Sequence, residues 1–315
     1  MLTSSIFIGV SLVLLFAGAE SLVRGSASLA VRAGLSALVI GLTIVAFGTS
    51  SPELVVSLQS VFAGKGDIAV GNIVGSNSFN IGVILGLAAL VCPIPVHRQV
   101  IKLDAPLALG VAGLLPVLMW DGWIGRAEGL LLVVGITAYV ALNVKLARKE
   151  TSAGVPDAEV ALGASVTRHW LVDLLSIAGG LVLLVIGSRL LVHHAVVLAH
   201  RFGVSEAVIG LTIVAAGTSM PELATSLVAA FRQQPDIAIG NVVGSNIFNI
   251  LGILGVSSLC VPVRSPGISV VDVGFMIAFS LLLVPLLYTG RILHRLEGLS
   301  LLAVYALYLY LLWPA

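Results

Sequence analysis

The sequence contains little charge and almost no cysteine. Only 10% of its 315 residues are charged, whereas 58% are hydrophobic, and the mean hydropathy is +1.13. Soluble domains of average composition are about 25% charged. The shortage of charge therefore excludes a soluble enzyme and a disordered chain. The net charge of +1 includes no basic excess, which argues against a nucleic-acid partner.

The chain also lacks the residues of a metal-thiolate site or an intramembrane enzyme. Cys92 and Cys260 show neither a metal-ligand spacing nor a disulfide framework. The segment GTSSPEL offers a serine and a carboxylate, but all six histidines fall near the ends of apolar runs. We therefore predict that the protein is not an enzyme and needs no cofactor.

Long apolar runs make up nearly the whole sequence. A transmembrane helix takes about 20 apolar residues, so the chain has room for about ten spans with short connections. We predict an all-α integral membrane protein with ten transmembrane helices. The predicted spans are 4–32, 36–62, 68–91, 104–120, 126–146, 171–200, 205–231, 237–260, 270–289 and 296–313.

The sequence repeats itself at an offset of 169 residues. GLTIVAFGTSSPEL begins at Gly41 and GLTIVAAGTSMPEL at Gly210, and residues 41–90 match 210–259 at 31 of 50 positions. Each half holds five predicted spans, and an odd number inserts the second half upside down. This predicts two inverted-topology five-helix repeats, an arrangement common among secondary transporters. The predicted units are a first repeat (1–147), a charged cytoplasmic linker (148–169) and a second repeat (170–315).

The distribution of Lys and Arg orients the predicted spans. With the N-terminus outside, eleven of these residues fall on the cytoplasmic side and five on the other side. We therefore predict a multi-pass protein of the cell (plasma or inner) membrane with both termini outside. The expected surroundings are the lipid bilayer, and the chain is expected to be a monomer.

Two carboxylates are predicted to lie in the middle of spans. Glu53 and Glu222 occupy the same position in each repeat, and each follows a proline. A charged group at the bilayer centre costs about 2.5–3.5 kcal/mol on insertion scales. No base is predicted at the same depth, because Arg24 and Arg189 fall at span ends. We therefore expect a mobile cation to be the partner of the two carboxylates.

Hydroxyl groups and backbone carbonyls accompany each carboxylate. Thr49 and Ser50 lie four and three residues before Glu53, on the same face of a helix. Pro52 cannot donate a hydrogen bond to the carbonyl four residues earlier, so we predict a kink or break with free carbonyls at 46–48. The second repeat carries the same pattern at 215–217, Thr218, Ser219, Pro221 and Glu222.

The span after each carboxylate adds further polar side chains. Ser76 and Asn80 lie four residues apart on one face, and Ser245 and Asn249 repeat the pattern. Asparagine within a span can simply hold helices together, but beside the carboxylates we assign these side chains to the same site. The pooled ligands are all oxygens, which suits hard cations such as Ca²⁺ or Na⁺ and argues against zinc or copper.

At these residues the sequence resembles the calcium/cation antiporter family and, within it, a prokaryotic sodium/calcium exchanger. The paired GTSxPE and GSNxFN segments carry the resemblance, which covers nearly the whole chain. It implies a central cluster of cation sites used in alternating access, with Glu53 and Glu222 as ligands. It also implies roles for Thr49, Ser50, Thr218, Ser219, Ser76, Asn80, Ser245 and the backbone oxygens of Ala46 and Ala215.

One position departs from the pattern of the family. Sodium/calcium exchangers of this group often have Asp where this chain has Asn249, which leaves two central carboxylates. The GNxxE pattern usual in the proton-coupled branch is absent. We predict an antiporter that exchanges Ca²⁺ for Na⁺, with H⁺-coupled or K⁺-coupled exchange and a cation channel as alternatives.

Overall fold

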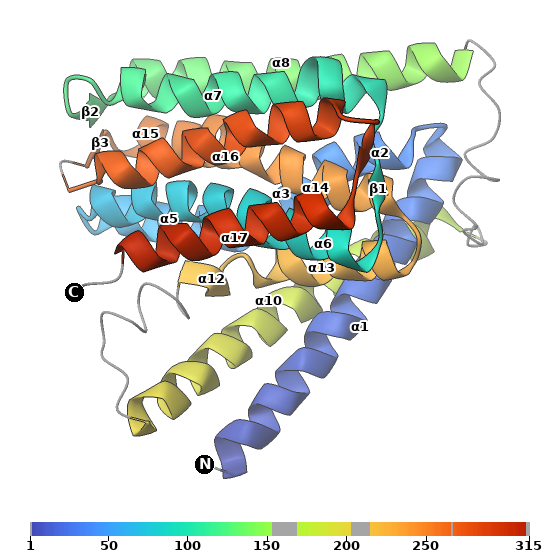
Figure 1. Ribbon diagram of the computed structural model, residues 1–315, viewed down its shortest axis with the longest axis horizontal. Coiled ribbons are helices and arrows are strands. Elements are labelled where there is room, and N and C mark those ends of the chain that lie inside the picture. The colour runs from blue at the N-terminus through green and yellow to red at the C-terminus, as the bar shows by residue number, and fades with distance from the viewer. Residues whose placement is uncertain (1, 153–168, 203–214, 266, 313–315) are drawn as a thin grey trace.

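The computed structural model describes residues 2–152, 169–202, 215–265 and 267–312. These residues form helices with short connections, and four strands of two residues each (Figure 1). The first half contains α1 (Leu2–Ala33), α2 (Ala37–Ile40), η1 (Gly41–Val45), α3 (Ala46–Thr49), α4 (Ser51–Phe62), α5 (Gly66–Phe79), η2 (Asn80–Leu85), α6 (Gly86–Val91), β1 (Ile94–Pro95), η3 (Val100–Asp104), α7 (Ala105–Leu118), β2 (Trp123–Ile124) and α8 (Arg126–Ser152). The second half contains α10 (Trp170–Arg201), α12 (Ala215–Gly217), α13 (Met220–Phe231), α14 (Pro235–Ile247), η5 (Phe248–Leu254), α15 (Gly255–Cys260), β3 (Val263–Arg264), α16 (Val270–Tyr288), β4 (Ile292–Leu293) and α17 (Arg295–Leu312).

The helices confirm the all-helical prediction and come close to the predicted number of spans. Eight helices in the described part of the chain are long and apolar enough to cross a membrane. Ala37–Thr49 and Ser51–Phe62 together form a ninth candidate, bent by 44°. The remaining predicted span, 205–231, is described only from Ala215, where it contains α12 and the twelve-residue helix α13.

The last helix of the first half extends into the range predicted as the linker. Helix α8 continues to Ser152, five residues into the range 148–169. Alanine, arginine, lysine and glutamate are good helix formers, which explains why the last turns of α8 run on into this charged stretch. Residues 153–168 of the predicted linker lie outside the described residues.

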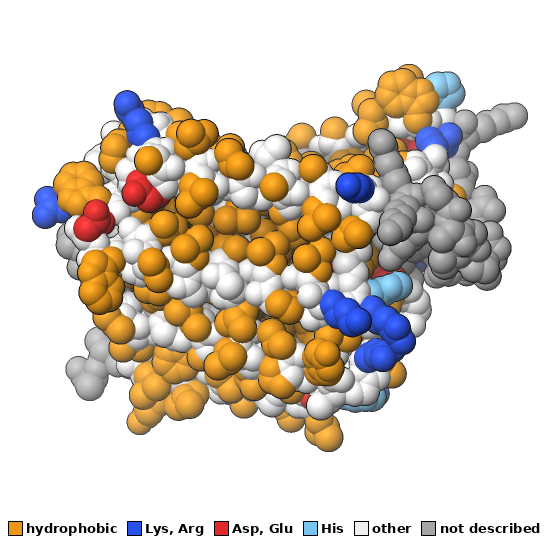
Figure 2. Space-filling view, turned by 90° about the horizontal axis from the view of Figure 1, so that it is seen from above, with side chains coloured by type: hydrophobic (Ala, Val, Ile, Leu, Met, Phe, Trp, Pro, Cys, Tyr) orange, Lys and Arg blue, Asp and Glu red, His pale blue; other side chains and the backbone are white. Residues whose placement is uncertain are grey.

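The outer surface suits a lipid environment. In Figure 2 hydrophobic side chains cover the middle of the molecule, and charged side chains gather toward the two ends of its long axis. Large apolar side chains such as Phe16, Leu175 and Leu281 are exposed on outer helices. A contiguous apolar surface of this kind marks a membrane or protein contact. Helices satisfy their own backbone hydrogen bonds in such surroundings.

The spans that carry the GSNxFN segments form the centre of the fold. The most apolar stretches of Gly66–Val91 and Pro235–Cys260 are 78% and 94% buried, whereas those of the other six long spans are 17–44% buried. Both central spans change from α-helix to π-helix partway along, at η2 and η5. Short π-helical segments inside α-helices occur frequently at functional sites. The polar residues of these spans are therefore enclosed by other helices and not by lipid.

Helices α1 and α10 pack against each other and run obliquely to the remaining bundle (Figure 1). Their contact depends on Gly18 and Gly180. A Cβ atom added at Gly18 would lie 2.8 Å from the carbonyl oxygen of Gly180, and one at Gly180 would lie 2.7 Å from the oxygen of Gly18. Glycine at both positions lets the two backbones touch, as small residues do in other transmembrane helix pairs.

The four short strands pair between the two halves. Strand β1 pairs antiparallel with β4, and β2 pairs antiparallel with β3. The two ladders lie at opposite ends of the bundle, so β1 and β3, which correspond at the offset of 169, are at different ends (Figure 1). At each end of the molecule, a connection of the first half is therefore hydrogen-bonded to a connection of the second half.

Candidate cation site

Glu53 and Glu222 lie at breaks in their helices, as the prolines predict. Helix α3 ends before Ser50, whose φ and ψ of −79° and 5° depart from helical values, and α4 then starts with Pro52 in its first turn. Ser219 has similar angles, −87° and 10°, before Pro221 in α13. Proline is tolerated in the first turn because the amide it lacks has no helical partner there. Both carboxylates are only 1% exposed.

Each carboxylate is held by a serine from the other half of the chain. The Ser219 hydroxyl donates to Glu53 Oε1 at 3.0 Å, and the Ser50 hydroxyl donates to Glu222 Oε1 at 2.9 Å. Ser50 and Ser219 correspond at the offset of 169, as do the two glutamates. The two halves therefore meet at this point in a reciprocal arrangement, in which each orients the other's acid.

One asparagine of each half makes hydrogen bonds to both broken helices. We call each asparagine, with the threonine that is hydrogen-bonded to it, the frame of the nearby carboxylate. Asn241 accepts a hydrogen bond from the Thr49 hydroxyl at 3.0 Å, and its amide donates to the Glu222 carbonyl at 3.3 Å and to Ser226 at 2.9 Å. The corresponding contacts in the other half join Thr218 to Asn72 (3.3 Å), Asn72 to the Glu53 carbonyl (3.3 Å) and Asn72 to Ser57 (3.2 Å). Sequence reasoning gave these asparagines no role, although their recurrence at the same offset was visible.

A second group of asparagines crosses between the central spans. Asn80 donates to Asn246 Oδ1 and Asn249 donates to Asn77 Oδ1, both at 2.9 Å. Asn77 and Asn246 also donate to each other's carbonyl, at 3.2 and 3.3 Å. The amide nitrogens of Asn80 and Asn249 are thus directed to the other half, and their amide oxygens remain for another partner.

Six buried oxygens in this region have no hydrogen-bond partner among the described residues. They form three pairs at the offset of 169, and each belongs to a side chain that is at most 1% exposed. The six are Glu53 Oε2, Glu222 Oε2, Ser76 Oγ, Ser245 Oγ, Asn80 Oδ1 and Asn249 Oδ1. Buried polar atoms are rarely left without a partner. An all-oxygen set of this kind matches the ligands preferred by hard cations.

Two of the carbonyls predicted to be free accept hydrogen bonds in this conformation. The Ala46 carbonyl, predicted to be free, accepts the Ser50 amide at 3.0 Å, because Pro52 removes only the bond to residue 48. Gly217, whose carbonyl Pro221 frees, accepts the Ser188 hydroxyl at 2.6 Å. Ala215 is the first residue of α12, directly after the undescribed range 203–214.

No basic side chain neutralises the two glutamates in the described part of the chain. The ion pairs recorded there lie elsewhere, where Arg24 and Arg232 pair with Glu20 and Arg32 pairs with Asp173. No group of three or more His, Cys, Asp and Glu side chains is found in the described ranges either. The site therefore combines two carboxylates with neutral oxygens, and burying two such charges costs several kcal/mol each unless a cation joins them.

A cavity approaches the site from the end of the bundle that holds β2 and β3. It has a volume of about 500 Å³, and its lining includes Asn72 and Thr218, which belong to the frame around Glu53. Asp272 and Tyr308 line it further out, where the Tyr308 hydroxyl donates to Asp272 Oδ1 at 2.8 Å. The cavity, whose other lining residues are mostly apolar, thus reaches the frame of the carboxylates from one end of the molecule.

Comparison with known proteins gives a consistent result over the whole chain. The sequence profile of the family described as sodium/calcium exchanger protein matches residues 3–145 and 172–313. A putative antiporter, CaxA, of Alkalimonas amylolytica is 40% identical over 100% of both chains. The sodium/calcium exchanger MaX1 of Methanosarcina acetivorans is 32% identical over 96% of both. The structure of the sodium-calcium exchanger NCX_Mj soaked with zero Na⁺ and Ca²⁺ superposes with a TM-score of 0.84, at 31% identity, over 98% of this chain and 99% of that one.

Proposed function

The chain belongs to the sodium/calcium exchanger protein family, and from this premise we propose that it is a secondary active antiporter that exchanges Ca²⁺ for Na⁺ at a site between its two halves. The family places the chain among multi-pass membrane proteins that transport ions by antiport, and its relatives are transporters and not enzymes. Ca²⁺ and Na⁺ are substrates of this family and not cofactors.

The six free oxygens are the observation that supports a transported cation most directly. Two of them belong to the carboxylates, which have no basic partner in the described residues, and the other four belong to serine and asparagine side chains of the central spans. One Ca²⁺ would balance the two negative charges, and monovalent cations would compete for the same oxygens. Competition for one site couples the two fluxes, because only an occupied carboxylate pair escapes the cost of its charge.

We assign the twelve predicted ligands to this site in two roles. Oxygens without a partner bind the cation in the conformation seen, and they belong to Glu53, Glu222, Ser76, Ser245, Asn80 and Asn249. The others orient the carboxylates and add oxygens when the helices move, and they are Thr49, Ser50, Thr218, Ser219 and the backbone of Ala46 and Ala215. The asparagines at 72 and 241 join this second group.

The proposed architecture is ten spans in two inverted repeats, with units at 1–147, 148–169 and 170–315. The reciprocal contacts at the offset of 169 support a two-fold relation between the halves. The positions of β1 and β3 at opposite ends of the bundle support inversion. We further propose that both termini lie outside the cell membrane, which puts the 500 Å³ cavity on the outer side.

The proposal is tested by measuring ⁴⁵Ca²⁺ uptake into proteoliposomes under an opposing gradient of Na⁺, K⁺ or H⁺ in turn. Uptake is expected to require the Na⁺ gradient. If three Na⁺ exchange for one Ca²⁺, one net charge moves, and uptake responds to voltage by about 2.3 kcal/mol per 100 mV. Uptake that depends only on a K⁺ or H⁺ gradient would identify that ion, in place of Na⁺, as the coupling ion. Uptake that is independent of every monovalent gradient would reject antiport.

Variants separate the proposed site from the rest of the fold. Glu53→Gln and Glu222→Gln are each expected to reduce uptake about 100-fold or more, because losing a charge interaction in a buried site costs about 3–5 kcal/mol. Glu128→Gln is the matched control. Glu128 Oε2 accepts a hydrogen bond from the Gly125 amide at 3.0 Å, and the side-chain oxygen of glutamine can accept the same bond. Full activity in either site variant would contradict the assignment.

A further inference from the structure

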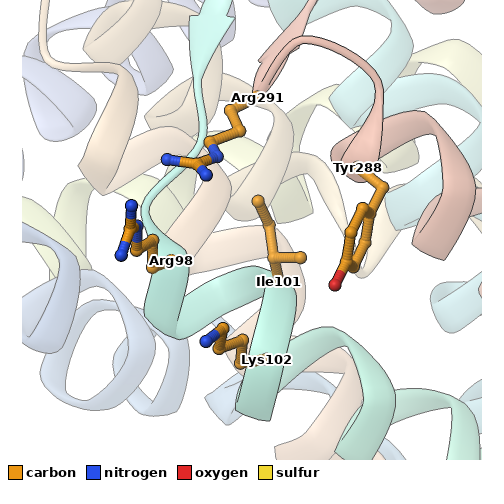
Figure 3. Close-up of a pocket in the computed structure, with 5 residues that line it drawn as sticks. All are labelled: Arg98, Ile101, Lys102, Tyr288 and Arg291. Carbon is orange, nitrogen blue, oxygen red and sulfur yellow. The ribbon is translucent and has the colours of Figure 1, made fainter.

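Three basic side chains surround a small cavity at the end of the molecule where β1 pairs with β4. The cavity has a volume of about 170 Å³ and is lined by Arg98, Ile101, Lys102, Tyr288 and Arg291. Figure 3 shows Arg98 and Arg291 converging from different segments, with Lys102 below them. The space is large enough for several water molecules or for a small polar group.

No acid neutralises these three charges within the described ranges, where the side chains of Arg98, Lys102 and Arg291 have no recorded ion pair. Nearby carboxylates have other partners. Asp104 accepts hydrogen bonds from Tyr139 at 3.0 Å and Gln99 at 3.2 Å, and Asp236 lies 3.3 Å from His97. A group of like charges with no counter-charge attracts an anion.

The internal repeat shows that the scaffold does not need these charges. The β2–β3 ladder at the opposite end reproduces the β1–β4 ladder at the offset of 169. There Gly122 stands in place of Arg291, and the residues that follow β3, 265–272, include no Lys or Arg. The paired strands therefore form without a base at the position of Arg291 and without a basic segment after the strand that corresponds to β1.

Arg291 gives the clearest sign that its side chain is required. Its φ is +55°, a left-handed conformation, whereas the corresponding Gly122 has φ +81°. Glycine adopts this conformation without steric cost, and other residues adopt it uncommonly. The carbonyl of Arg291 accepts the Val96 amide at 2.8 Å, a contact that glycine would make equally well. The backbone thus favours glycine, and the guanidinium is what arginine adds.

The cavity lies where spans end. Lys102 is in the first turns of the span Val100–Leu118, and Tyr288 is the last residue of the span Val270–Tyr288. Tyrosine is enriched at the boundary between membrane and water, and basic pockets between spans bind the head groups of anionic lipids. We propose that this cavity binds a phosphate group, which an anionic phospholipid supplies at the membrane boundary or free phosphate supplies from solution. A phosphate held there bridges the two halves of the chain.

The test is titration of the purified full-length protein in detergent with dioleoylphosphatidylglycerol, with dioleoylphosphatidylcholine and with inorganic phosphate. Native mass spectrometry counts the bound lipid, and calorimetry measures the binding of phosphate. We expect one phosphatidylglycerol to bind more tightly than phosphatidylcholine. Arg98→Gln and Lys102→Gln should each weaken it about fivefold, the effect of one basic residue near a membrane surface. Binding of inorganic phosphate with the same losses, and no preference among lipids, would identify free phosphate as the ligand.

Two further variants keep the proposal separate from folding. Arg291→Gly should weaken binding about as much as the other two changes and leave the thermal unfolding temperature unchanged or higher, because glycine suits the backbone. Lys145→Gln removes an exposed lysine from the same predicted side of the membrane, outside the cavity, and should leave binding unchanged. The proposal is wrong if Lys145→Gln weakens binding equally, or if neither phosphatidylglycerol nor phosphate binds with a preference that depends on the three bases.

Discussion

The two halves surround the carboxylates with almost the same residues, yet one half is open and the other is closed. Ile68 on α5 is 51% exposed, whereas the corresponding Ile237 on α14 is fully buried. Thr218 and Asn72 border the 500 Å³ cavity, while their counterparts Thr49 and Asn241 are fully buried. Equal residues in unequal surroundings are what alternating access requires, because the two halves can exchange surroundings when the site opens to the other side.

Chemical accessibility should show the largest difference between the halves. Ile68→Cys and Ile237→Cys are introduced separately after Cys92 and Cys260 are replaced by serine. Reactivity of a thiol depends on its exposure, so a membrane-impermeant maleimide should label position 68 nearly completely and leave position 237 unlabelled. Labelling from the outside of intact vesicles also tests the proposed orientation. Equal labelling at the two positions would show that the two halves are equally accessible, and would contradict the distinction between an open and a closed half.

Each half also has an aspartate that accepts a hydrogen bond from a tyrosine. Replacing these two aspartates by asparagine should affect the free energy of unfolding unequally, a smaller difference between the halves than that in labelling. Asp104 is fully buried and both of its oxygens accept hydrogen bonds, whereas Asp272 lines the cavity and is partly exposed. In Asp104→Asn the new NH₂ group either faces the Gln99 nitrogen, which cannot turn because it also donates to Asn143 at 2.6 Å, or donates to the Tyr139 oxygen and leaves the Tyr139 hydroxyl proton without an acceptor. We expect this change to cost about 1–3 kcal/mol in the free energy of unfolding.

Asp272→Asn serves as the matched variant. Its remaining carbonyl can accept the Tyr308 hydroxyl, and water in the cavity can solvate the new amide, so the expected change is within about 0.5 kcal/mol. Denaturation of both variants in the same detergent measures the difference. A loss at Asp272 as large as that at Asp104 would mean that the cavity is closed to water.

The smallest effect is expected where the halves differ in sequence. Thr225 is fully buried and its hydroxyl has no partner among the described residues, whereas the corresponding Val56 lines the cavity. Thr225→Val should be neutral or stabilising by up to about 1 kcal/mol, because it removes an unpaired buried hydroxyl. Val56→Thr should change the free energy of unfolding by less than about 0.5 kcal/mol. A clear destabilisation by Thr225→Val in unfolding measurements would show that its hydroxyl is bonded.

The sequence predicted the spans and the break at each proline because hydropathy and proline chemistry act locally. It also singled out Glu53 and Glu222 because a charge within an apolar run is conspicuous. The free carbonyl predicted at Ala46 was wrong for this conformation, since the Ser50 amide remains available to it. The prediction treated the whole turn as broken, whereas proline removes only one backbone hydrogen bond.

The contacts between the halves could not be read from the sequence. That Ser50 holds Glu222, and not the Glu53 three residues away, depends on how two distant helices meet. The roles of Asn72 and Asn241 depend on the same packing. Likewise, the repeat predicts equivalent positions but says nothing about which of two equivalent positions is open, because that is a property of one conformation.

The reciprocal hydrogen bonds have a consequence for biosynthesis. Ser219 follows Glu53 by 166 residues, so at about 5–20 residues per second the ribosome makes it roughly 10–30 seconds after Glu53 has been translated. During that interval the first half enters the bilayer with a carboxylate that lacks its hydroxyl partner. A truncated first half would therefore insert with an incomplete polar centre, and quality-control proteases of the membrane could distinguish it from the finished chain.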